Sequence, residues 1–392
     1  MQPKEKKNKK AESAETEEAK ILTASNQLKS FLVEKKDDHY QFEKPVDVLV
    51  PSGSLIFDFH LDGGIGPGLH RFTGINEGGK SSSALGFLFN FLSKKEKRRG
   101  VLMKAEGRLS KEMMARSGIK FVFSAEEWTD GTCFVFESNI YETTVDLMRT
   151  LVKKNDEGIQ YFFILDSVDG LILKNDLDKD TGDSNKVAGG AVIAGTLMKK
   201  MAIALQKRGH VAIFISQVRA DVQLDPYSKE PVRQTTATGG NALLHFANYI
   251  FEFNPRWNGD LILENPDEKP DVKKNPILGH FCSITVKKSP NEITGRKIRY
   301  PIKYGRTNGT SNWLEKEVFD ILVSWNVLNK KGAWISWQED FFQEAKNAGI
   351  DLPEKIQGIN RFDELVENDV KVREYLINYC KNGHKEDSEL SK

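Results

Sequence analysis

Residues 74–81 of this 392-residue chain match the phosphate-binding pattern G-x-x-x-x-G-K-[ST] at every fixed position. An apolar stretch (69–73) precedes the match and an apolar, helix-like stretch (82–92) follows it, which predicts a strand, a loop and a helix in that order. The glycines let several backbone N–H groups point at one anion, and the helix N-terminus adds partial positive charge. The alternative, a glycine-rich surface turn, is disfavoured by these flanks. The predicted loop is Gly74, Ile75, Asn76, Glu77, Gly78, Gly79, Lys80 and Ser81, followed by Ser82.

This loop predicts that the chain binds a nucleoside triphosphate. The Lys80 ammonium would reach the β- and γ-phosphates, and the Ser81 hydroxyl would ligate Mg²⁺. A second signal is the apolar stretch 161–165, which ends in Asp166. In P-loop enzymes a carboxylate at the end of such a strand holds the Mg²⁺ shell. Ser81 and Asp166 are therefore the predicted metal-binding residues.

Two more polar side chains follow apolar strands. Glu106 comes after 101–103 and could orient an attacking water, although a surface acid is the alternative. Gln217 comes after 211–215, where its amide can lie near a γ-phosphate. Because residues two apart on a strand share a face, Lys104 is expected beside Glu106. Its ammonium would then lower the pKa of that carboxyl and its strength as a base.

A long stretch with little apolar periodicity, 220–238, follows Gln217. Loops of this length are usually functional or disordered. It runs into a cluster of hydroxyls, glycines and one amide that suits a phosphate backbone, and two arginines add cations. The alternative is a flexible hairpin tip. The residues predicted to bind such a backbone are Arg219, Arg233, Thr235, Thr236, Thr238, Gly239, Gly240 and Asn241.

Apolar strand-like runs alternate with helical stretches, which predicts an α/β fold with a mostly parallel central sheet. The expected divisions are a charged tail with an amphipathic helix (1–45), an ATPase core (46–311) and a small α-rich C-terminal domain (312–392). The expected strands beyond those above are 132–136, 249–253, 281–287 and 298–304, the last three hairpin-like, and the expected helices include 21–33, 143–152 and 191–205.

Composition excludes several classes of protein. The formal net charge of +1 gives no overall excess of cations, so a nucleic acid would be bound by local groups. The three cysteines form no C-x-x-C pair, which argues against a zinc site or a disulfide framework. No apolar run approaches the ~18 residues that span a bilayer, and the N-terminus lacks a signal-peptide pattern. A cytoplasmic protein without a membrane partner is expected.

Taken together, these residues resemble the RecA family of ATP-dependent homologous recombinases over about residues 50–340. The string Thr-Gly-Gly-Asn-Ala-Leu (238–243) is the specific one, because P-loops occur in many ATPases. The other matching strings are Pro-Ser-Gly-Ser (51–54), the P-loop, Lys-Ala-Glu (104–106), Leu-Asp-Ser-Val (165–168), Gly-Asp-Ser (182–184), Ser-Gln-Val-Arg (216–219), Lys-Lys (287–288) and Lys-Gly-Ala-Trp-Ile (331–335).

The resemblance implies a RecA-like fold with ATP and Mg²⁺ as cofactors. It also implies helical filaments on single-stranded DNA, exchange with double-stranded DNA, and DNA-stimulated ATP hydrolysis in DNA repair. Glu106 would activate water, Gln217 would sense the γ-phosphate, and Lys287 with Lys288 would reach the ATP of the adjacent subunit. Residues 174–187 and 220–241 would be the two DNA-binding loops, and the N-terminal helix would pack on a neighbouring subunit.

The chain departs from the family pattern at three points. Lys104 stands where the family commonly has Asp. Ser289 stands at the family's second lysine position, unless Lys288 takes that role after a one-residue shift. Met113 or a neighbour replaces an aromatic that usually stacks on adenine. Such departures are typical of a divergent, for example phage-encoded, member. Two alternatives stay open: a hexameric motor or signalling ATPase with a RecA fold, and an accessory filament protein that does not hydrolyse ATP.

Overall fold

The computed structural model describes residues 24–36, 41, 46, 48–107, 109–153, 155, 158–176, 201–220, 235–237, 245–265 and 268–390. Contacts divide the chain into two compact units, Met1–Val46 and Asp47–Lys392. In the first unit, residues 24–34 are helical, and the large apolar side chains of Leu28, Phe31 and Val33 are exposed. The predicted amphipathic helix is thus confirmed over its described part. No helix within these ranges is both long and apolar enough to cross a membrane.

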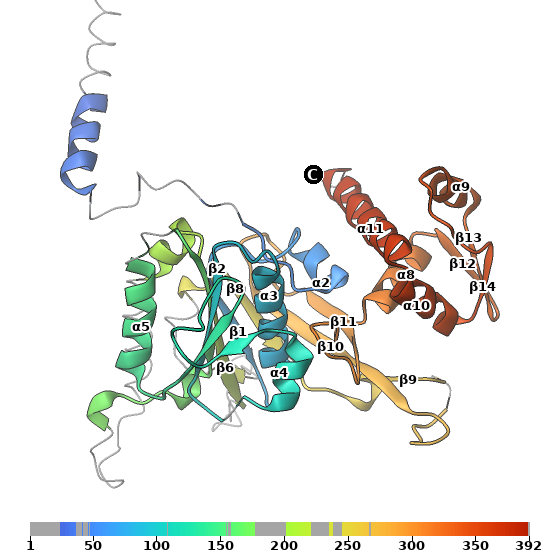
Figure 1. Ribbon diagram of the computed structural model, residues 1–392, viewed down its shortest axis with the longest axis horizontal. Helices are drawn as coiled ribbons and strands as arrows, with labels where there is room; N and C mark the ends of the chain where they lie inside the picture. The colour runs from blue at the N-terminus through green and yellow to red at the C-terminus, as the bar shows by residue number, and fades with distance from the viewer. Residues whose placement is uncertain are drawn as a thin grey trace, which may run out of the picture. The chain divides into compact units, whose positions relative to one another are not determined.

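A large sheet organises the second unit (Figure 1). Among the described residues it has eleven strands, in the order β11-β10-β8-β1-β6-β5-β2-β4-β3, with β7 paired to β6 and β9 to β10. Strands β3, β4, β2, β5, β6, β1 and β8 run parallel, and β10 and β11 close one edge as an antiparallel pair. The α/β fold with a mostly parallel central sheet is confirmed.

The strands of this sheet are β1 (Gly68–Gly74), β2 (Arg98–Lys104), β3 (Phe121–Val122), β4 (Cys133–Glu137), β5 (Gln160–Asp166), β6 (Val211–Ala220), β7 (Thr235–Ala237), β8 (Tyr249–Phe253), β9 (Leu261–Leu263), β10 (Ile277–Lys288) and β11 (Lys297–Lys303). The helices around it are α2 (Leu55–His60), α3 (Lys80–Ser93), α4 (Lys111–Ser117) and α5 (Tyr141–Lys153), with 3₁₀ turns η2 (Val168–Gly170), η3 (Lys174–Asp176) and η4 (Asn258–Asp260). Residues 201–207 are also helical.

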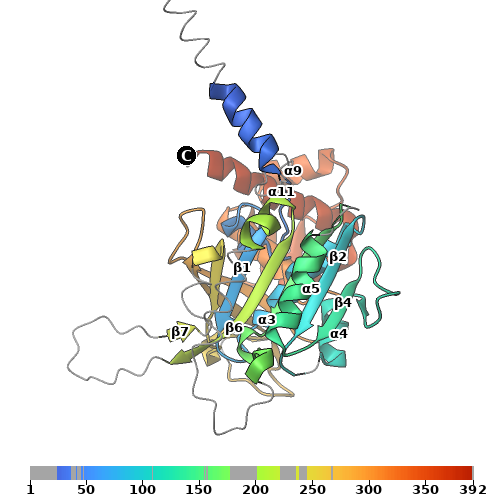
Figure 2. The ribbon, with the colours of Figure 1, turned by 90° about the vertical axis from the view of Figure 1, so that its left-hand side faces the viewer.

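Helices cover both faces of the parallel strands, which explains the continuous apolar runs 101–103, 161–165 and 211–215 within β2, β5 and β6. Helix α5 lies on one face and α3 on the other (Figures 1 and 2). The buried side of α3, including Leu88 and Phe91, packs with Phe72 of β1, Ile164 of β5 and Ile213 of β6 in one apolar core. The strand predicted over 69–73 and the helix predicted over 82–92 therefore pack into the same core.

The C-terminal part of the second unit has its own apolar cluster. Its helices were expected, but a three-stranded antiparallel sheet was not, and the exposed Trp334 and the buried Trp337 lie on that sheet. The elements are α8 (Leu314–Ser324), β12 (Leu328–Lys331), β13 (Trp334–Trp337), α9 (Glu339–Asn347), β14 (Lys355–Gln357), α10 (Ile359–Asn368) and α11 (Val370–Leu390).

Helix α2 joins this C-terminal part to the large sheet. Leu55 belongs to the C-terminal cluster, whereas Phe57 packs in the core of the sheet. The buried carboxyl of Glu317 on α8 accepts hydrogen bonds from the Ser54 hydroxyl and the Leu55 N–H, each at 2.6 Å. A carboxyl group here satisfies donors at the start of α2 that the helix itself cannot satisfy.

Candidate functional site

The phosphate-binding loop connects the end of β1 to the start of α3. Gly74 has a φ of 145° and Gly79 a φ of 98°, a region that favours glycine. At Gly74 an added Cβ would also collide with the backbone oxygen of Phe253 on β8. The two glycines of the pattern are therefore required by the backbone path of the loop, and α3 begins at the lysine that follows them.

Lys80 is buried at the first turn of α3, and its side chain lies along the loop. Its Nζ donates to the backbone oxygens of Gly74 at 2.8 Å and Ile75 at 2.5 Å. Burial lowers the pKa of this ammonium, while the carboxylates of Asp166, Asp169 and Glu106 oppose the shift. Three acids around one lysine keep a positive charge beside the loop, where phosphate would bind.

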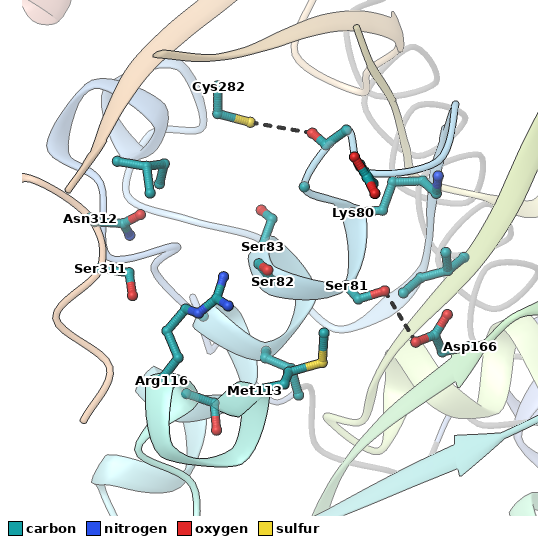
Figure 3. A pocket seen from close by; sticks show the side chains of 18 of the residues that line it. Lys80, Ser81, Ser82, Ser83, Met113, Arg116, Asp166, Cys282, Ser311 and Asn312 are labelled. Atoms are coloured by element: carbon teal, nitrogen blue, oxygen red, sulfur yellow. Dashed lines mark hydrogen bonds between the residues drawn. The ribbon is translucent and has the colours of Figure 1, made fainter. Parts of the chain in front are cut away.

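Ser81 and Asp166 come together as the sequence predicts. The Ser81 hydroxyl donates to Oδ2 of Asp166 at 3.1 Å, because the first turn of α3 faces the end of β5 (Figure 3). No group of three or more histidine, cysteine or acidic side chains in the described residues could hold a metal alone. Mg²⁺ typically takes one or two protein oxygens together with substrate phosphates. The hydroxyl and carboxylate at this position fit that requirement.

Lys104 lies against Asp166, which corrects the expectation that it lies beside Glu106. Its Nζ is 2.8 Å from Oδ2 of Asp166. The two residues are register partners on the parallel strands β2 and β5. Strand β2 ends at Lys104, and 105–107 form a bend. The two-residue alternation that placed Lys104 and Glu106 on one face therefore does not extend to Glu106.

Glu106 and Gln217 meet on the same side of the loop. Nε2 of Gln217 is 3.4 Å from Oε2 of Glu106. Gln217 pairs in register with Gly74, so it lies directly beside the start of the phosphate-binding loop. A Cβ at Gly170 would collide with the Glu106 side chain, so that glycine leaves room for the carboxylate. The structure thus brings both predicted side chains to the edge where Asp166 lies.

A pair of charged residues behind Gln217, the buried Arg71 and the partly exposed Asp169, was not found by the sequence analysis. The Gln217 N–H donates to the Asp169 carboxylate at 2.7 Å, and Nε of the buried Arg71 donates to the Ser216 hydroxyl at 3.0 Å. Burial lowers the pKa of Arg71 to about 10, and the charge of Asp169 opposes that shift. The available signal was Arg71 itself, a charged residue inside a stretch (69–73) that the sequence predicts to be a strand. Arg71 and Asp169 support the strand that carries Gln217.

One cavity of about 600 Å³ is lined by the phosphate-binding loop and by the side chains of Glu106, Asp166 and Gln217. Its far end is formed by α4, β11 and the segment before α8, where Met113, Arg116, Ser311 and Asn312 lie (Figure 3). The Ser311 hydroxyl is buried without a hydrogen-bond partner among the described residues. Met113 lies at the end of the cavity where the base of a nucleotide was expected. The volume and polarity suit a nucleotide whose phosphates point toward Lys80.

The predicted DNA-binding residues are only partly described. Strand β6 continues beyond Gln217 and pairs antiparallel with β7, Arg219 opposite Thr236 and Ala220 opposite Thr235 (Figure 2). The pairing brings the start of the stretch that follows Gln217 next to Thr235–Ala237. The remaining predicted residues, Arg233, Thr238, Gly239, Gly240 and Asn241, lie outside the described residues, as does most of 174–187.

Lys287 and Lys288 lie at the end of β10. Nζ of Lys287 is 3.4 Å from a Glu252 carboxylate oxygen, and Nζ of Lys288 donates to the backbone oxygen of His245 at 2.8 Å. The Lys287 side chain is about half exposed, at 46%. A role at the nucleotide of a neighbouring subunit stays a prediction.

The comparisons with known proteins agree with this geometry. The family model described as the RecA N-terminal domain matches residues 35–266. Among curated proteins, the chain is similar to Protein RecA of Citrifermentans bemidjiense, with 26% identity over 78% of this chain and 80% of that protein. It is also similar to Protein RecA of Campylobacter fetus subsp. fetus (24% identity, 84% and 89%) and of Wolinella succinogenes (26% identity, 82% and 87%).

Proposed function

Since this chain belongs to the RecA family, we propose that it is an ATP-dependent DNA recombinase. In this proposal it forms helical filaments on single-stranded DNA, promotes homologous pairing and strand exchange, and hydrolyses ATP in response to DNA. The support is the family match together with a nucleotide-sized cavity whose polar groups are those of a P-loop ATPase.

The nucleotide part of the proposal assigns a role to each polar group of the cavity. Lys80 and the loop N–H groups would bind the phosphates, and Ser81 with Asp166 would hold Mg²⁺. When bound there, Mg²⁺ would neutralise charge on the phosphate oxygens. Glu106 would accept a proton from the attacking water, and Gln217 would contact the γ-phosphate. The 3.4 Å approach of Gln217 to Glu106 supports placing both beside the same reacting group.

The DNA part rests on the continuity of one strand. Strand β6 carries Gln217 beside Gly74 and then leads directly into the segment 220–241. This is the observation that carries the proposal, because nucleotide and DNA sites joined by one strand can influence each other. We assign 174–187 and 220–241 to DNA binding, Lys287 and Lys288 to the neighbouring subunit's ATP, and helix 24–34 to contacts between subunits.

The test combines electron microscopy with a phosphate-release assay. With single-stranded DNA and a non-hydrolysable ATP analogue, open helical filaments are expected, and DNA should stimulate phosphate release from ATP. Lys80→Ala should abolish both while the protein stays folded by circular dichroism, because the cation that holds the phosphates is gone. Lys94→Ala, an exposed lysine after α3, is the matched control. Closed rings that form without DNA would instead identify a motor.

One observation favours a second candidate, an accessory filament protein that binds ATP without hydrolysing it. The Lys104 ammonium contacts the carboxylate that would hold the metal. Phosphate release that stays at background at every Mg²⁺ concentration, despite normal filaments, would support this candidate over the recombinase with an active ATPase.

A further inference from the structure

The carboxylate of Asp166 carries an unusual pair of donors for a metal-binding group. Both the Lys104 ammonium, at 2.8 Å, and the Ser81 hydroxyl, at 3.1 Å, contact the same oxygen, Oδ2. A serine hydroxyl can turn its oxygen toward a metal and stay in place. An ammonium has only N–H donors and cannot ligate a cation, so it occupies Asp166 without completing a metal site.

Backbone geometry and burial fix this ion pair. Lys104 and Asp166 are the last residues of two neighbouring parallel strands and lie in register. The two side chains are only 10% and 15% exposed. Charges in such a position are screened less than surface pairs. The contact is therefore set by the register of the two strands, and the ammonium stays close to any cation bound at Asp166.

We propose that Lys104 is a resident cation of the metal site that competes with Mg²⁺ for Asp166 and raises the Mg²⁺ concentration at which nucleotide binds productively. The inference rests on the proposed nucleotide site. A divalent cation must displace the ammonium from Oδ2 or bind beside it, and both weaken metal binding. The same positive charge attracts a nucleotide that carries no Mg²⁺. Lys104 thus affects metal-loaded and metal-free nucleotide in opposite directions.

The experiment titrates a fluorescent, non-hydrolysable ATP analogue with the full-length protein, first in EDTA and then across Mg²⁺ concentrations. Lys104→Met removes the charge, and Lys104→Gln removes it but keeps a donor for Asp166. In both variants, Mg²⁺-dependent binding of the analogue should be half-maximal at an Mg²⁺ concentration roughly tenfold lower than in wild type. The reason is that two cations a few ångströms apart repel strongly. In EDTA the same variants should bind the analogue more weakly than wild type. Lys94→Met is the control.

The outcomes separate this inference from the proposed function. A lower Mg²⁺ requirement together with weaker binding in EDTA supports competition at Asp166. Unchanged Mg²⁺ dependence in a folded Lys104→Gln protein that still binds the analogue overturns the inference and leaves the nucleotide site standing. If wild type binds no analogue at any Mg²⁺ concentration, both the site and the inference are wrong. Lys104→Arg, which keeps the charge, should behave as wild type.

Discussion

Gln217 is held at two points, its N–H by Asp169 and its side chain by Glu106. We expect Gln217→Ala to leave nucleotide affinity nearly intact, because Lys80 and the loop N–H groups remain. DNA affinity should however no longer depend on whether ATP or ADP is bound, because the side chain that would contact the γ-phosphate is gone. Fluorescence anisotropy at one fixed salt concentration measures both affinities.

The control for that variant is Gln343→Ala, which changes an exposed glutamine on α9. Coupling of binding is reciprocal, so DNA should also stop strengthening ATP binding by the same factor in Gln217→Ala. A variant that keeps the wild-type ratio of the two DNA affinities would show that Gln217 is merely a strand-end residue.

Asp169 offers a second test at the residue scale. Asp169→Ala removes the acceptor of the Gln217 N–H and the charge opposite the buried Arg71, so the free energy of unfolding should fall by about 1–3 kcal/mol. Asp169→Asn keeps an acceptor oxygen and should lose less. Urea unfolding followed by circular dichroism compares the two. Equal losses would mean that the charge matters and the hydrogen bond does not.

The sequence was sufficient to predict the side chains of the site that directly follow an apolar strand. Asp166 and Gln217 each follow such a run, and carboxyl ends of parallel strands share one edge of the sheet. Arg71 and Asp169 were missed, because their pairing depends on which strands are neighbours. The prediction that Lys104 lies beside Glu106 was wrong for a related reason. Side-chain alternation along a strand can be expected from the sequence, but the bend at 105–107 cannot.

At the scale of elements, Glu317 links α8 to the start of α2 and makes stability depend on pH. Burial raises its pKa to about 8, and that of nearby Asp58 to about 7. A carboxyl whose pKa is higher in the folded state binds more protons there than in the unfolded chain. The free energy of unfolding should therefore fall as pH rises from about 5 to 8.

Glu317→Gln should reduce that slope, because its amide does not titrate. Urea unfolding at several pH values between 5 and 8 measures the slope for wild type and variant. Glu374→Gln, an exposed position on α11, is the matched control and should keep the wild-type slope. A Glu317→Gln slope as steep as wild type would assign the pH dependence to other groups, such as Asp58.

The elements that were predicted share a strong local signal. Continuous apolar runs bounded by turns mark the buried parallel strands, and Gly-Lys-Ser marks the start of α3. The sheet β12-β13-β14 was missed, because strands of three or four residues show too little alternation to separate from helix. Its third strand, Lys355–Gln357, also comes from beyond α9, so the pairing is not local in the chain.

At the scale of the whole molecule, the first unit, Met1–Val46, is predicted to take part in filament formation. Leu28, Phe31 and Val33 are exposed on helix 24–34, and such apolar side chains are typical of contact surfaces. We expect removal of residues 1–40 to shorten or abolish filaments on DNA with the ATP analogue, as measured by sedimentation and electron microscopy. Circular dichroism should show an unchanged fold for the second unit.

A substitution in helix 24–34 distinguishes the contribution of this helix to filament formation from that of the charged tail. Phe31→Ser in the full-length chain should weaken filaments as the truncation does, whereas removal of residues 1–20 alone should not. Filaments of full length in the 1–40 truncation would show that the first unit takes no part in assembly.

The six residues of α2 limit how this molecule could be rearranged in evolution. Phe57 stacks on Tyr300 and meets Phe87 and Phe251 edge-on in the core of the sheet, while Leu55 belongs to the C-terminal cluster. A C-terminal part transplanted from a relative would have to bring its own acid for Ser54 and an apolar surface for Leu55. The two parts are therefore expected to be inherited together, and chimaeras joined near residue 312 should succeed only when both sides of this helix match.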